Sequence, residues 1–170
     1  MNLERREGNR PVTGSALPHL QLSDRSPEDV HGHMSDWALH ALPAATPEVR
    51  EEPTRISVPS TRALWLDESV DANPAGFMPP PGSREFAHLH ADGSWHILVD
   101  ETLVSEIVDK GWGERHPWYD RGVLEVMVYA PRDLEEAETT KALVLESVRY
   151  ASKGAAIPFS KQPGKGSEQV

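Results

Sequence analysis

Three histidines lie on either side of one tight turn, and imidazole is the side chain best suited to bind a metal or move a proton near neutral pH. They are His88, His90 and His96, with the pair Asp92-Gly93 between two runs of alternating apolar residues. An Asp-Gly pair in that position is typical of the turn in an antiparallel hairpin. The sequence therefore predicts that two neighbouring strands carry the three imidazoles.

The length of the turn decides whether these side chains share a face. A three-residue loop over 91–93, with its glycine left-handed, pairs His90 with Ser94 and His88 with His96. Because cross-strand partners share a face, all three histidines then lie together. A two-residue loop would send His96 to the opposite face. The first register separates polar from apolar residues more cleanly, so we favour it.

The favoured register also predicts what surrounds the histidines. It places Phe86 and Leu98 on the histidine face and Glu85 on the opposite one, so that Asp92 or Glu114 would be the oxygen ligands of any metal. The opposite face is otherwise apolar and consists of Ala87, Leu89, Trp95 and Ile97.

The three-histidine pattern leaves three interpretations open. The histidines could bind zinc or iron, since these metals accept imidazole ligands. They could line a metal-free pocket in which one of them acts as a base. They could also have no chemical role and alternate with apolar residues only because their face of the sheet is exposed to solvent.

A second group of residues could complete such a site. His116 lies in an aromatic-rich loop with Trp112 and Trp118, which could wall a planar ligand. Tyr129 and Arg132 lie at a strand end that could reach the same pocket, where an arginine could pair an enolate or a carboxylate. The alternative for this group is ordinary packing of the loop and a surface ion pair.

The elements that must position these residues indicate an α+β domain. We expect a mostly antiparallel sheet of about five strands with two to three helices packed on one face. Residues 1–26 are polar with scattered glycine and proline and predict a flexible arm, 27–151 form the domain, and 152–170 predict a disordered tail. The expected helices are Val30 to about Pro43, Asp100–Gly111 and Asp133–Ala151; the expected strands are Ile56–Val58, Ala63–Leu66, the two of the hairpin, and Leu124–Tyr129.

Composition excludes several classes of function. A formal net charge of −10 argues against binding to nucleic acids, which are polyanions. The absence of cysteine excludes disulfides and thiolate chemistry. No apolar run is long enough to cross a bilayer, so we expect a cytoplasmic protein without a membrane partner. Glycine-rich nucleotide-binding motifs are absent, and the sequence carries no signal for an oligomeric state.

Several motifs resemble those of the luciferase-domain family, which comprises fungal luciferases and bacterial proteins and is distinct from the flavin-dependent bacterial luciferases. The matching runs cover about residues 50–151 and include Arg84–His96 without Ala91 and Trp95, Gly111-Trp112-x-Glu114-x-His116-Pro117, Val126-Met127-Val128-Tyr129-x-Pro131-Arg132-Asp133, and Ser147–Ala151. The resemblance implies oxygenation of a hydroxylated pyrone by molecular oxygen. It carries the candidate active-site roles to His88, His90, His96 and His116.

We therefore expect a small-molecule enzyme that needs no cofactor and acts as an oxygenase or proton-transfer catalyst on a planar, enolisable metabolite. His88, His90 and His96 are its expected catalytic residues, and loss of the enol proton to one of them would produce an electron-rich enolate. The substrate-binding residues are expected to be His116, Trp112, Trp118, Tyr129 and Arg132. The alternatives are a non-catalytic ligand-binding or interaction module and a metalloenzyme that uses the same three histidines.

Overall fold

The computed structural model describes residues 1–154, and the last sixteen residues of the predicted tail lie outside this range. The helices are α1 (Glu28–Asp36), α2 (Leu42–Ala45), α3 (Glu101–Asp109) and α4 (Leu134–Ala151), with a π-helical stretch over Trp37–Ala41 and short 3₁₀ turns at Pro74–Gly76 and Tyr119–Arg121. The strands are β1 (Val49–Pro53), β2 (Arg62–Leu66), β3 (Glu85–Leu89), β4 (Trp95–Ile97), β5 (Gly113–Arg115) and β6 (Val126–Val128).

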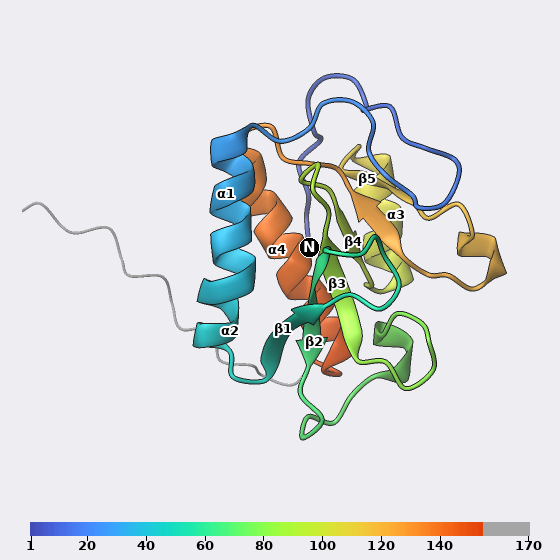
Figure 1. The fold of residues 1–170 in the computed structure, drawn as a ribbon. Coiled ribbons are helices and arrows are strands. Elements are labelled where there is room, and N and C mark those ends of the chain that lie inside the picture. The colour runs from blue at the N-terminus through green and yellow to red at the C-terminus, as the bar shows by residue number, and fades with distance from the viewer. Residues whose placement is uncertain (155–170) are drawn as a thin grey trace, which may run out of the picture.

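The six strands form one sheet in the order β1-β2-β3-β4-β6-β5, and each neighbouring pair is antiparallel (Figure 1). The expected α+β class and antiparallel sheet are confirmed. The sheet has one strand more than expected: β1 and β5 were not predicted, whereas the predicted strand Ile56–Val58 does not form.

One face of the sheet is covered by helices α1, α3 and α4 (Figure 1). Ala87, Ile97 and Val126 form one apolar row of this face, and Leu89, Trp95 and Val128 form the next. The helices begin where the sequence predicts: the side chains of Asp100 and Asp133 accept hydrogen bonds from the backbone N–H groups of Leu103 and Glu136. Within residues 1–154, none of the helices has both the length and the apolar character that a membrane crossing requires.

The opposite face of the sheet carries a row of side chains that includes two of the three histidines. Cross-strand pairing aligns Ala63 of β2, His88 of β3, His96 of β4, Met127 of β6 and Glu114 of β5. No helix covers this row in the described part of the chain. It is covered instead by the loop over 54–60 and by the N-terminal segment, and these coverings create the candidate site.

The structure places the N-terminal segment, residues 1–26, against the domain, whereas we expected a flexible arm. Leu3, His19 and Gln21 are buried. The side-chain oxygen of Gln21 accepts a hydrogen bond from the backbone N–H of Ala130 (2.9 Å), and the carbonyl of Glu4 accepts one from the indole of Trp112 (2.7 Å). These partners are about a hundred residues away in sequence, so no local pattern revealed them.

One predicted strand was also wrong, and the first helical region ends slightly later than predicted. Residues Ile56–Val58 form a loop rather than a strand, because the hydroxyl of Thr54 accepts hydrogen bonds from the N–H groups of Ile56 and Ser57 (3.2 Å each) and turns the chain. The first helical region continues past Pro43 to Ala45, and the π-helical stretch Trp37–Ala41 lies directly before the turn that contains this proline.

Candidate active site

The hairpin of β3 and β4 has the predicted register. His88 pairs with His96, the N–H of His90 donates to the carbonyl of Ser94 (2.9 Å), and Gly93 is left-handed with φ +96°. The ring centroids of His88, His90 and His96 lie 4.7–5.1 Å apart, and all three side chains are buried. The prediction that the three imidazoles share one enclosed space is confirmed.

Glu85 also lies on the histidine side, although we predicted it on the opposite face. The pairing of β2 with β3 slips at Phe86, since Leu64 pairs with Ala87 but Trp65 pairs with Glu85. Such a bulge reverses the alternation of side chains before it. Phe86 consequently joins the core on the helix side rather than the histidine face.

The carboxylate of Glu85 fixes the orientation of His88. It accepts hydrogen bonds from Nδ1 of His88 (2.9 Å), from the hydroxyl of Thr54 (2.8 Å) and from the backbone N–H of Arg55 (3.0 Å). Because a carboxylate only accepts, the proton of the neutral imidazole lies on Nδ1. Nε2 of His88 is then a bare acceptor, and it is buried without a hydrogen-bond partner in the described part of the chain.

His90 lies behind the other two histidines. Its Nδ1 faces the hydroxyl of Ser94 (3.1 Å) and its Nε2 faces that of Ser57 (3.3 Å). Burial and the neighbouring imidazoles His96 and His88 lower the pKa of His90 far below the ordinary value, so the ring is neutral.

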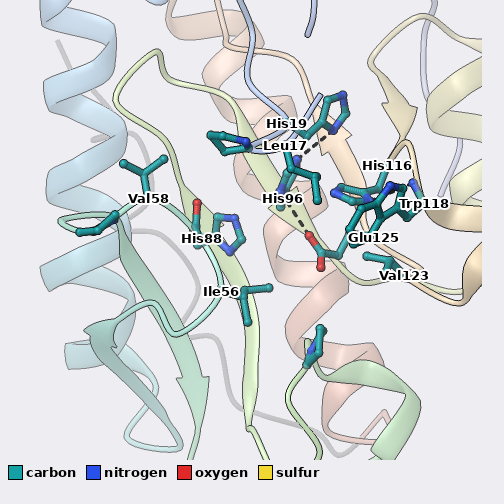
Figure 2. Close-up of a pocket in the computed structure, with 14 residues that line it drawn as sticks. Leu17, His19, Ile56, Val58, His88, His96, His116, Trp118, Val123 and Glu125 are labelled. Atoms are coloured by element: carbon teal, nitrogen blue, oxygen red, sulfur yellow. Dashed lines mark hydrogen bonds and ion pairs between the residues drawn. The ribbon is translucent and has the colours of Figure 1, made fainter. Parts of the chain in front are cut away.

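His96 lies between a carboxyl group and a further histidine. Its Nδ1 is 3.2 Å from the carboxyl of Glu125, and its Nε2 is 3.3 Å from Nδ1 of His19 (Figure 2). Burial lowers the pKa of His96 and raises the pKa of Glu125, so each is shifted toward its uncharged form.

A cavity of about 540 Å³ opens onto this cluster. Its polar groups are His19, Ser57, His88, His96, His116 and Glu125, and Trp118 stands at the rim with 43% of its surface exposed (Figure 2). The remaining lining is apolar and comes from Leu17, Pro18, Ile56, Val58, Pro59, Pro79 and Val123. A few converging polar groups within an apolar wall are typical of a site for a small organic molecule.

His116 and Trp118 thus line the cavity, as predicted. The backbone N–H of Trp118 donates to Nδ1 of His116 (3.2 Å), so the neutral ring of His116 carries its proton on Nε2. Burial lowers the pKa of His116.

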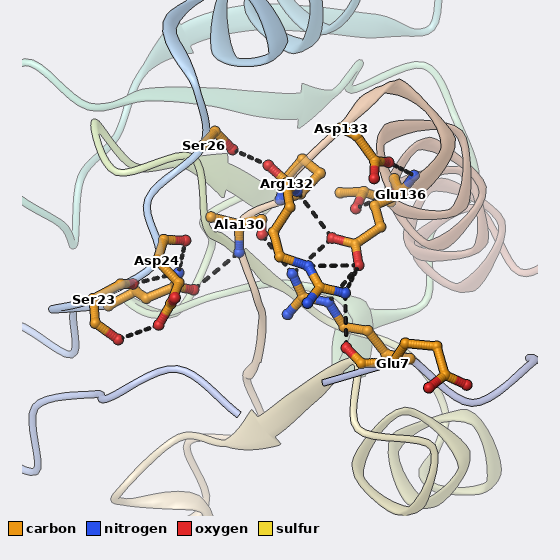
Figure 3. Close-up of polar contacts among 12 residues, drawn as sticks. Glu7, Ser23, Asp24, Ser26, Ala130, Arg132, Asp133 and Glu136 are labelled. Carbon is orange, nitrogen blue, oxygen red and sulfur yellow. Dashed lines mark hydrogen bonds and ion pairs between the residues drawn. The ribbon is translucent and has the colours of Figure 1, made fainter. Parts of the chain in front are cut away.

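Three residues predicted to bind substrate lie elsewhere. Trp112 packs beneath the first residues of the chain, and Arg132 pairs with Glu136 and the carbonyl of Glu7 (Figure 3). The hydroxyl of Tyr129 donates to Glu114 (2.9 Å) and so reaches the cluster only through other side chains. Arg132, which lies just before α4, is held by the carboxylate of Glu136 on that helix, and this ion pair is the alternative that we gave for it.

The residues that could hold a metal are His88, His90 and His96. Each offers one nitrogen, and these atoms lie within 4.8 Å of one another. Nδ1 of each ring faces an oxygen, from Glu85, Ser94 and Glu125 respectively. An oxygen partner on one ring nitrogen is typical of histidines that bind metals, and the donor set fits zinc or iron.

Comparison with known proteins agrees with the motifs in the sequence. Residues 83–147 match the family model described as luciferase domain. The chain is 29% identical to a luciferase of Armillaria ostoyae over an alignment 175 residues long, which covers 91% of this chain and 63% of that protein. It is 35% identical to a luciferase of Neonothopanus nambi over 107 residues, which cover 56% of this chain and 40% of that protein. The chain is thus similar to fungal luciferases.

The resemblance to the luciferase-domain family is therefore confirmed. The chain spans about 63% of the length of its Armillaria relatives. No solved structure matches the chain.

The match to the luciferase domain contains most of the site but not all of it. Glu85, His88, His96 and Glu125 lie within residues 83–147, whereas His19 lies outside them. The sequence did not reveal the role of Glu85, because the bulge is not visible in it. It did not reveal the role of His19, because the residues around His19 show no hydrophobic periodicity. Glu125 had a signal: it is an acidic residue at the edge of an apolar strand.

Proposed function

We propose that this protein is a small-molecule enzyme of the luciferase-domain type, a cofactor-independent oxygenase or proton-transfer catalyst that acts on a planar, enolisable metabolite. The observation that carries the proposal is that Nε2 of His88 is buried without a hydrogen-bond partner in the described residues, on a side chain that lines an apolar cavity and is backed by the carboxylate of Glu85. A buried acceptor without a partner calls for a donor from a ligand, because leaving it unpaired costs about 1–3 kcal/mol.

The first step is a proton transfer. The acidic O–H or C–H bond of the substrate breaks, its proton moves to Nε2 of His88, and its electron pair remains on the substrate as an enolate. The imidazolium that forms on His88 lies 2.9 Å from the Glu85 carboxylate, which stabilises the new charge. Glu85 thus strengthens His88 as a base without touching the substrate.

The second step is the reaction of the enolate with molecular oxygen. The enolate carbon donates its electron pair to oxygen, a C–O bond forms, and the product is a peroxide anion. The apolar walls of the cavity keep water from this anion. His96 and His116 are neutral donors or acceptors at the wall, and their lowered pKa values keep positive charge away from His88 before the reaction.

The test uses a panel of hydroxylated 2-pyrones with the purified full chain. Oxygen consumption is measured with an electrode, and incorporation of ¹⁸O₂ into the product is measured by mass spectrometry. We expect His88→Gln to lower turnover by at least about 100-fold. The control His40→Gln changes an exposed histidine and leaves turnover as in the wild type. Full turnover in His88→Gln would contradict the proposal, and pyrone binding without any reaction would favour a binding module.

A second candidate is a metalloenzyme, and the clustering of one nitrogen from each of His88, His90 and His96 favours it. A bound zinc or iron ion would supply Lewis-acid or redox chemistry, with the three imidazoles as its ligands. Elemental analysis of protein purified without a polyhistidine tag separates the candidates. One equivalent of zinc or iron that is lost in the triple His→Ala variant would support the metalloenzyme, and a metal content near zero with retained turnover would exclude it.

A further inference from the structure

His19 completes the histidine cluster from outside the hairpin. It is 2% exposed, and its ring centroid lies 5.3 Å from that of His96 and 5.4 Å from that of His116. Other contacts of the same segment fix the position of His19. The segment that carries His19 closes on itself through a β-bridge between Thr13 and Gln21, and Gln21 is bonded to Ala130.

Glu114 determines which nitrogen of His19 carries the proton. Its carboxylate accepts hydrogen bonds from Nε2 of His19 (2.9 Å), from the hydroxyl of Thr13 (2.7 Å) and from that of Tyr129 (2.9 Å). Burial would raise the pKa of Glu114, but these hydrogen bonds outweigh it and lower the pKa. The carboxylate is therefore an acceptor only, and the neutral ring of His19 carries its proton on Nε2.

The proton position of His19 in turn determines that of His96. Nδ1 of His19 is left as an acceptor, so Nε2 of His96, 3.3 Å away, must be the donor. Nδ1 of His96 is then the acceptor that faces the carboxyl of Glu125 at 3.2 Å (Figure 2).

We propose that His19 is a positioning residue which, together with Glu114, holds His96 in the tautomer protonated at Nε2 and so presents a bare Nδ1 to Glu125 at the cavity wall. Its effect on turnover rests on the proposed function, whereas the tautomer itself is a property of the free protein. The N-terminal segment is in this way part of the active site, although it lies outside the luciferase-domain match.

The other groups around His96 do not compete for its nitrogens. The rings of His88, His90 and His116 lie 5.1, 4.7 and 5.6 Å from it, centroid to centroid. Nδ1 of His88 is bonded to Glu85, both nitrogens of His90 face hydroxyl groups, and Nδ1 of His116 accepts from the backbone. In the described residues, the polar groups that lie against the nitrogens of His96 are His19, which is hydrogen-bonded to Nε2, and Glu125, whose carboxyl is 3.2 Å from Nδ1.

The experiment reads the tautomer directly. Protein labelled with ¹⁵N-histidine is studied by long-range ¹⁵N–¹H correlation at pH 8, above the ordinary imidazole pKa of about 6.5. The His96 signals are assigned from their absence in His96→Gln. We expect a pyrrole-type Nε2 and a pyridine-type Nδ1 in the wild type. A proton on Nδ1 of His96 overturns the proposal without the need for any further variant.

Two variants then test the cause. Glu114→Gln and His19→Gln should each convert His96 to a mixture of tautomers and lower kcat on the hydroxylated pyrones by about 10- to 100-fold, with KM little changed. Glu68→Gln, an exposed glutamate changed in the same way, should behave as the wild type. An unchanged tautomer in either folded variant overturns the proposal. If the wild-type chain turns over no pyrone, the proposed function fails while the tautomer measurement still decides the role of His19.

Discussion

Replacement of Glu85 by glutamine tests the part of the site on which the proposed base depends. The wild-type carboxylate accepts three hydrogen bonds, from His88 and Thr54 at one oxygen and from Arg55 at the other. Glutamine offers one oxygen and one NH₂ group in the same volume. The NH₂ group of the glutamine must therefore face a hydrogen-bond donor, either the backbone N–H of Arg55 or the donors of His88 and Thr54.

Each orientation of the amide has its own cost. If the NH₂ group faces Arg55, a buried backbone N–H loses its acceptor, which costs about 1–3 kcal/mol. If it faces His88, the imidazole must change tautomer and presents an N–H rather than a bare nitrogen to the cavity. In both cases charge-assisted hydrogen bonds become neutral ones, each weaker by about 1 kcal/mol. We expect Glu85→Gln to lower the free energy of unfolding by about 2–4 kcal/mol and turnover by about 10²- to 10⁴-fold.

The two effects are measured separately. Urea denaturation followed by circular dichroism gives the free energy of unfolding, and ¹⁸O₂ incorporation into a hydroxylated 2-pyrone gives turnover. Glu68→Gln is the matched control because its side chain is exposed. Stability within about 0.5 kcal/mol of the wild type would refute the three-bond account of Glu85. Unchanged turnover in a folded variant would refute its role in supporting His88.

Two further predictions concern the scaffold. Gly93→Ala should lower the free energy of unfolding by at least about 1–3 kcal/mol, because φ is +96° and the added Cβ would clash with the hydroxyl of Ser26. Gly122→Ala, where φ is +92° and no atom lies near the added Cβ, measures the backbone contribution alone in the same denaturation experiment. Equal losses of stability in the two variants would contradict the contact with Ser26. Burial would raise the pKa of Glu136, but hydrogen bonds from its two arginine partners lower it from 4.5 to about 2. The folded-state pKa is the lower one, so this stabilisation is present above pH 4.5 and is lost as the pH falls toward 2; after solvent screening it amounts to about 1–2 kcal/mol, and Glu136→Gln should remove that part of the acid dependence.

The hairpin could be predicted from the sequence because its determinants are local. The turn chemistry of Asp92-Gly93 and the alternation on both sides define a register, and the register brings His88 and His96 together. The helices α3 and α4 were predictable for the same reason, since Asp100 and Asp133 mark their first turns.

The rest of the site depends on contacts that no local pattern reports. A single-residue bulge at Phe86 moves Glu85 to the other face, and alternation alone does not show where a strand slips. Strand β1 was missed because it is an edge strand, whose polar residues need not alternate. The partners of His19 were missed because they are distant in sequence.

The order in which the chain is synthesised has a consequence for the N-terminal segment. His19 leaves the ribosome early, yet its partners His96 and Glu114 follow it by 77 and 95 residues. Until the strands that carry them have paired, the segment has nothing to dock on, and closing so long a loop is slow. Maturation of this domain should therefore end with the burial of the segment around His19, and a chaperone that holds this nascent segment would delay the appearance of the pocket more than the appearance of the sheet.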